Sequence, residues 1–187
     1  TAALANMLRV EQLQSQIQQR ASEWREQLAL KKATSDVLRV ISRSPGDPMP
    51  VFREMLASAN RLLGTTISAI LSYENGLMDM AAHSGWSQEA LDRASHFYPG
   101  PPNPAMLSGR VILTGKVQTI NDTLTDKNYD SVTAHAAPWR RMLGVPMRSH
   151  HGRTVGAIVV GWSEPGVNSS RERALLQTFA EQAAIAI

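Results

Sequence analysis

The run Thr154–Trp162 constrains the fold more than any other stretch, because it is apolar and rich in β-branched residues throughout. Successive side chains of a strand point to opposite faces of the sheet. One face would carry Val155, Ala157 and Val159, and the other Ile158, Val160 and Trp162. Both faces then need a cover, so the run predicts a central strand in a sheet that is buried on both sides.

The segments beside this strand predict a hairpin and a helix. Met142–Met147 is a second apolar run, and Ser149–Gly152 between the two runs has the length and the glycine of a hairpin loop. Downstream, Ser169 and Glu172 have the spacing of a capping box, in which each residue satisfies an amide at the start of a helix. The expected order is therefore hairpin, loop and amphipathic helix.

Earlier in the chain, Asn75-Gly76 is typical of a type I′ turn and predicts a hairpin between Thr65–Tyr73 and Leu77–His83. Helical patterns precede and follow this hairpin, and we expect helices over 47–63, 87–94 and 106–113. Asn121–Pro138 is long and polar, which is uncommon inside a compact domain unless the segment is a lid or a binding loop.

The first 44 residues contain neither glycine nor proline, and Pro45-Gly46 then interrupts the pattern. They predict one helix about 60 Å long, which is too long to lie wholly on a small domain. An apolar stripe recurs along it at an eleven-residue spacing, which predicts a nearly straight helix pair: Val10, Leu13, Ile17, Ala21, Trp24 and Leu28. The alternative is that this stripe packs on the helix's own domain.

The chain thus divides into a long helix over residues 1–44 and a domain over residues 45–187. A hydrophobic content of 43% suffices for one buried core, and no apolar run approaches the ~20 residues that span a bilayer. Because the chain starts at Thr1 and stops inside an apolar helical pattern, we expect a fragment whose last helix is truncated. The parent protein could still be anchored in a membrane.

Several of these motifs occur in an order that resembles a GAF domain. Leu143–Met147, Val155–Val159 and Phe179–Ile187 resemble the closing third of that family, while Gly109–Lys116 and Ile120–Asp122 resemble its middle. The resemblance spans roughly residues 34–187 and implies an α+β, PAS-like fold. An antiparallel sheet would be covered by helices on one face and by loops on the other, behind a long coiled-coil-type helix.

The resemblance is nearest to GAF modules of bacterial sensor histidine kinases and nucleotide cyclases. It implies a cytoplasmic regulatory module, not itself an enzyme, that binds a small molecule and relays a signal to an effector domain beyond Ile187. Bilin attachment through cysteine and methionine sulfoxide reductase chemistry are both excluded, because the chain has no cysteine. The signature of cyclic-nucleotide-binding GAF domains is also missing, since only Lys127–Asp130 resembles it. The ligand or cofactor therefore stays unknown.

Aromatic and polar residues of the expected loop face form our candidate ligand site: His83, Phe97, Tyr98, Arg110, Asp122, Tyr129 and Trp139. We expect no metal site, because adjacent His150 and His151 would diverge in a hairpin loop. Asp122, Asp126 and Asp130 lie among residues that favour loop capping over metal binding. Nucleic acid is not an expected partner, since no basic cluster accompanies a groove-reading motif.

The expected partner is a second copy of the chain, in a parallel homodimer. The candidate interface combines the stripe with the last helix: Val10, Leu13, Ile17, Trp24, Leu28, Phe179 and Ala183. Two alternatives stay open. The module could be a dimerisation spacer whose cavity is filled by its own side chains, or an enzyme that uses the loop-side pocket, although the chain carries no P-loop, His-Glu-x-x-His or Gly-x-Ser-x-Gly motif.

Overall fold

A five-stranded antiparallel sheet forms the centre of the domain, in a computed structural model that describes residues 2–43 and 47–185. The strands lie in the order β2-β1-β5-β4-β3, so that β5 is central, as the apolar run predicts. Their bounds are Ile67–Glu74 for β1, Leu77–Ser84 for β2, Gln118–Ile120 for β3, Arg141–Arg148 for β4 and Thr154–Trp162 for β5.

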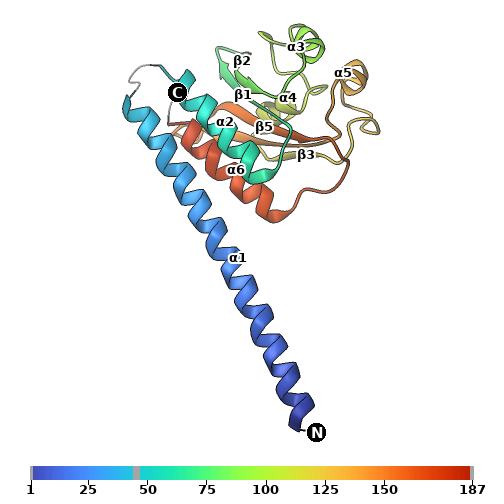
Figure 1. The fold of residues 1–187 in the computed structure, drawn as a ribbon. Coiled ribbons are helices and arrows are strands. Elements are labelled where there is room, and N and C mark those ends of the chain that lie inside the picture. Colours follow the sequence, from blue (N-terminus) through green and yellow to red (C-terminus); the bar gives the residue numbers. More distant parts are fainter. Residues whose placement is uncertain (1, 44–46, 186–187) are drawn as a thin grey trace.

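Helices cover the two faces of the sheet unequally (Figure 1). One face is covered by α2 (Met49–Leu63) and α6 (Ser170–Ala183), against which the end of α1 (Ala2–Arg43) packs. The other face carries three short helices and the loops between them: α3 (Gln88–Ala94), α4 (Leu107–Thr114) and α5 (Ser131–Ala136). The predicted arrangement of helices on one face and loops on the other is confirmed.

Two apolar cores lie on opposite sides of the sheet. On the helix side, Phe52, Met55 and Phe179 pack against strand residues such as Ile158 and Val160. On the loop side, a second core lies between the sheet and the α3–α5 layer and includes several aromatic rings. Ala157 and Val159 contribute to it, as predicted, whereas Val155 packs on the helix side. The pairing register shifts between Met147 and Arg148, next to this end of β5, which interrupts the simple alternation.

The local turn and cap predictions are confirmed. Asn75 and Gly76 both adopt positive φ angles, 52° and 82°, which a type I′ turn requires. Ser169 and Glu172 form the reciprocal hydrogen bonds of a capping box, and Ser87 caps α3. The segment 121–138 is less irregular than expected, because it contains α5.

Helix α1 extends far beyond the domain, and only its C-terminal part contacts it (Figure 1). There, Ala33 is completely buried, and the Gln182 side chain of α6 donates a hydrogen bond to Thr34 Oγ1 at 3.0 Å. The division that we place between residues 44 and 45 falls among 44–46, which lie outside the described residues, so it stays a prediction. Among the described helices, none has the length and hydropathy needed to cross a bilayer.

Candidate functional site

An aromatic cluster fills the space between the sheet and the loop-side helices. Trp139 has no exposed surface, and its indole Nε1 donates a hydrogen bond to the Tyr129 hydroxyl at 3.2 Å. Trp86 lies beside Trp139, with ring centroids 4.8 Å apart, and donates to the Ser68 carbonyl oxygen. The Tyr98 hydroxyl lies 2.5 Å from Ser108 Oγ. Each polar atom of these rings thus has a partner inside the protein.

Little space is left within this cluster. The cavity enclosed by the aromatic rings and the sheet measures about 10 Å³, roughly the room that one water molecule needs. Burial raises the pKa of Tyr98 to about 12, and it raises the pKa of Tyr129 further. Both phenols are therefore neutral at ordinary pH, and the cluster is an uncharged, nearly closed core.

Three ion pairs fasten the segment between β3 and β4 around this core. Each aspartate accepts two hydrogen bonds from one arginine: Asp122 from Arg140, Asp126 from Arg110, and Asp130 from Arg93. Each aspartate also accepts a hydrogen bond from a backbone N–H two or three residues further along the chain. The capping role that we predicted is confirmed, while the arginine partners come from distant parts of the chain.

These contacts change the acidity of the three carboxyl groups. Hydrogen bonds from Arg140 lower the pKa of Asp122, and hydrogen bonds from Arg110 lower that of Asp126. For Asp130, burial opposes ionisation, but bonds from Arg93 and Thr133 outweigh it and lower the pKa to about 2. All three carboxylates are ionised and already paired.

The predicted ligand site is brought together only in part. Tyr98, Tyr129 and Trp139 meet in the aromatic cluster, and Phe97 lies at its margin, half-buried beside Arg93. The other three residues do not join the cluster. His83 is exposed on the edge strand β2, while Arg110 and Asp122 belong to the surrounding ion pairs.

Trp86 and Ser108 are the cluster residues that the sequence analysis missed. Trp86 follows Gly85 at the end of β2, and Ser108 lies in the first turn of α4. Neither position carries a local pattern that separates it from an exposed turn residue, so the pairing with Trp139 and Tyr98 depends on the tertiary fold.

A second candidate surface lies on α1. Five of the six predicted stripe residues are exposed, with 52% of Val10, 51% of Leu13, 66% of Ile17, 65% of Trp24 and 52% of Leu28 accessible, and the sixth, Ala21, is half-buried. Successive helical residues are about 100° apart, so this stripe lies almost opposite the face that packs on the domain through Leu30 and Ala33. The alternative that the stripe packs on its own domain is therefore wrong.

The two α6 residues of the predicted interface lie elsewhere. Phe179 and Ala183 have no exposed surface and belong to the helix-side core. Because their side chains are already covered within the chain, they cannot contact a second chain. The spacing of apolar residues correctly predicts which side of α6 is apolar. That side packs against the sheet of its own domain, and not against a second chain.

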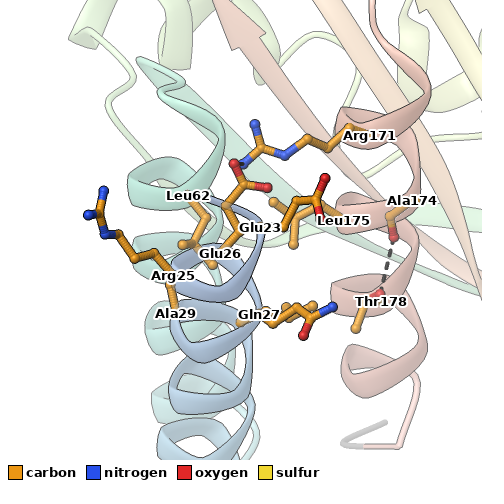
Figure 2. A pocket seen from close by; sticks show the side chains of 11 residues that line it. Glu23, Arg25, Glu26, Gln27, Ala29, Leu62, Arg171, Ala174, Leu175 and Thr178 are labelled. Atoms are coloured by element: carbon orange, nitrogen blue, oxygen red, sulfur yellow. Dashed lines mark hydrogen bonds and ion pairs between the residues drawn. The ribbon is translucent and has the colours of Figure 1, made fainter. Parts of the chain in front are cut away.

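A cleft of about 460 Å³ lies where α1 leaves the domain, between α1, α2 and α6. Its apolar lining comes from all three helices: Ala29, Leu30, Leu62, Ala174 and Leu175. Figure 2 shows Glu26 and Arg171 reaching toward each other beside it, and their charged atoms are 2.9 Å apart. Glu23 and Gln27 point toward α6, whereas Arg25 points away from it (Figure 2). No sequence pattern predicts this cleft, because its lining comes from three separate helices.

Metal binding finds no support in the part of the chain that the structure describes, since no group of three or more His, Cys, Asp or Glu side chains there could hold an ion. His150 and His151 are exposed in the loop between β4 and β5.

Comparison with known proteins gives one family and many similar folds. A family profile described as GAF domain matches residues 50–187. A GAF domain from a phosphoenolpyruvate-protein phosphotransferase of Coxiella burnetii superimposes with a TM-score of 0.70 at 14% identity, covering 86% of this chain and 91% of that one. The corresponding Acinetobacter domain gives 0.67 at 15% identity, covering 86% and 91%.

Enzymes share this fold as well. The free methionine-R-sulfoxide reductase of Neisseria meningitidis, in complex with its substrate, gives a TM-score of 0.66 at 13% identity and covers 86% of this chain and 87% of that one. No curated protein matches the chain by sequence. At such identities the structural likeness shows the fold alone.

Proposed function

This chain belongs to the GAF domain family, and from that premise we propose that it is a regulatory module that relays a signal through paired α1 helices. GAF domains are usually regulatory or sensory. The family match spans residues 50–187, which is almost the whole domain that follows α1. The parent would be a bacterial signalling protein, such as a cytoplasmic or membrane-anchored histidine kinase or a nucleotide cyclase.

The exposed stripe of α1 is the observation that carries this proposal. Five large apolar side chains stand half or more exposed along one straight line of a helix that projects from the domain. Burying an aliphatic side chain contributes on the order of 1.5–3 kcal/mol, so such a line favours a helical partner. The stripe is narrow, as in a two-helix seam, rather than broad as on a helix that lies on a core.

A second copy of the chain is the proposed partner. In a parallel two-fold dimer, both domains lie at the same end of the paired helices, so a change in helix crossing or rotation reaches two effectors together. The C-terminal end of α1 is firmly joined to the domain through Ala33 and the Gln182–Thr34 hydrogen bond. A movement of the domain therefore moves α1.

The closed aromatic cluster favours the relay role over ligand binding at the loop face. A cavity of about 10 Å³ admits a small molecule only if Trp86, Tyr98 or Tyr129 moves aside. Loop-side sensing of a small molecule is thus the alternative function. Native mass spectrometry separates the two, because an extra mass that is lost on denaturation would favour the sensor.

Catalysis is not part of the proposal. The loop-face tyrosines are held neutral by raised pKa values, and the nearby aspartates are each paired with an arginine. An active site that uses acid and base catalysis needs one group that gives up a proton and another that accepts it near the working pH. Neither the tyrosines nor the paired aspartates meet this requirement. The absence of cysteine also separates this chain from reductases that depend on thiols.

Changing Ile17 and Trp24 together to glutamate tests the relay dimer. We expect the wild-type chain to be a dimer by light scattering, and Ile17→Glu/Trp24→Glu to be a monomer whose domain melts as before. Gln12→Glu/Ser22→Glu adds the same two charges to exposed positions away from the stripe and should leave the dimer intact. A full-strength dimer in the stripe variant would place the interface on the domain itself.

A further inference from the structure

We propose that Ala21 sets the register of the paired α1 helices, because it leaves the room that the Trp24 rings of both chains need. The helices would pair in parallel and without a shift, so that each stripe residue meets the same residue of the second copy. This inference rests on the proposed helical dimer and names the residue that determines how its two helices are aligned.

Ala21 is the one small residue in a stripe of large ones. At about 100° per residue, the six stripe side chains fall within an arc of about 80°, so each would form one layer of the seam between two helices. Five of them are large and 51–66% exposed, whereas Ala21 is half-buried. The smallest layer of the seam therefore lies three residues, or about 4.5 Å, before the largest layer at Trp24.

The direction of the Trp24 side chain brings these two layers together. Long side chains of a helix lean toward its N-terminus and cover the preceding turn, so the indole ring of Trp24 reaches the level of Ala21. Well-packed interfaces alternate large and small side chains, so that neighbouring layers interlock. Two tryptophans and two alanines fill adjacent layers in this way, and a second copy of the chain supplies both of the residues that are needed.

The stripe also separates this register from the nearest competing one. Its apolar spacing repeats after eleven residues, so a shift of eleven would again bring apolar residues together. Only three of the six layers would then be paired, and the Trp24 ring would lean on Val10 of the second copy in place of Ala21. The unshifted pair buries all six layers and keeps the space beside both rings.

The charges beside the stripe suit an aromatic layer at this level. Arg20 and Arg25 are exposed and flank the stripe on opposite sides, so in a parallel pair Arg20 of one chain lies beside Arg25 of the other. Guanidinium groups stack favourably on the faces of aromatic rings. Trp24 is the one aromatic residue of the stripe, so its two rings stand where they can offset the repulsion between these arginines.

Ala21→Leu tests the inference through the sign of its effect. In an ordinary helical seam a larger apolar side chain tightens the pair, because it buries more apolar surface. Here we expect the dimer dissociation constant, measured by sedimentation equilibrium, to rise about ten-fold or more, since the leucine takes the space of the ring. In a Trp24→Leu background the same change should lower the constant. Ala5→Leu is the matched control at an exposed α1 position outside the stripe, and should stay within about two-fold of wild type.

Disulfide cross-linking gives a direct measurement of the register, because the chain has no cysteine of its own. A disulfide requires Cα atoms about 4.4–6.8 Å apart. Ala21→Cys and Leu28→Cys should each cross-link two chains in the presence of oxidised glutathione, since only the unshifted parallel pair brings both positions close to their copies. Ser22→Cys is the control, because that exposed position faces away from the stripe and should not cross-link.

The outcomes separate this inference from the proposed function. A dimer that is unchanged or tighter in Ala21→Leu, or that does not cross-link through Ala21→Cys, overturns the inference, while the helical dimer stands. A wild-type chain that is monomeric at all concentrations overturns the proposed function and this inference together.

Discussion

Arg110 holds Asp126 by two hydrogen bonds, of 2.8 and 3.0 Å, and thereby joins α4 to the segment between β3 and β4. The same guanidinium group donates through Nε to the Pro104 carbonyl oxygen at 2.7 Å. One arginine therefore fastens two loops that are separated in the sequence by a helix and a strand.

Asp126→Asn should lower the free energy of unfolding by about 1.5–3 kcal/mol, the usual contribution of hydrogen bonds to a charged group. Arg110 would be left largely buried with a weaker partner. Urea unfolding measures the change. Glu74→Gln removes a carboxylate from the exposed last residue of β1 and is the control, expected within about 0.5 kcal/mol of wild type. Equal losses in both variants would show that net charge, rather than the ion pair, matters.

Acid should destabilise the domain through Asp130. Its pKa in the folded protein is about 2, below the ~3.9 of an unfolded aspartate. The unfolded chain therefore binds more protons in this range, and stability present above pH 4 is lost as the pH falls toward 2. Urea unfolding at a series of pH values should show this slope, and Asp130→Asn should reduce it. An unchanged slope in the variant would assign the acid sensitivity to other groups.

Alkali should act through the buried tyrosines. The pKa of Tyr98 is raised to about 12, and that of Tyr129 is raised as well. Their contribution to stability is complete below the unfolded value of about 10 and is lost as the pH rises from there toward 12. At pH 11, addition of urea should therefore produce a step in tyrosinate absorbance near 295 nm. A native protein with all three tyrosines already ionised at pH 11 would contradict the closed cluster.

Gly109→Ala should cost about 3 kcal/mol, at the upper end of overpacking penalties. A Cβ atom there would lie 1.9 Å from the Asn103 carbonyl oxygen, which is backbone and cannot turn aside. At Gly166 a Cβ would meet only ordinary contacts at 3.5 Å, so Gly166→Ala serves as the control. Thermal unfolding of both variants measures the difference. Similar melting temperatures would mean that the loop before α4 shifts freely.

The elements that sequence analysis predicted correctly carry local signals. The turn at Asn75-Gly76, the cap at Ser169 and the β-branched run of β5 each depend on residues close together in the chain. Helix α5 was missed because its six residues, Ser131–Ala136, are too few to show an apolar period.

The candidate site was predicted only in part, since its contacts join distant segments. Tyr98, Tyr129 and Trp139 stood out as aromatic residues near loops, and the fold does bring them together. The sequence does not predict which arginine pairs with each aspartate, because every arginine of the chain is an equally good candidate until the tertiary fold is known. The same holds for the cleft, which exists only where three helices meet.

The buried Ala33 acts mechanically as a fulcrum. It has no exposed surface, while the helix N-terminal to it extends for 31 residues to Ala2, an arm of about 46 Å at 1.5 Å per residue. A tilt of about 5° at such a pivot displaces the far end sideways by about 4 Å, roughly half of the 8–10 Å that separates the axes of two packed helices. A small tilt at Ala33 thus becomes a sideways displacement large enough to change how two paired helices cross.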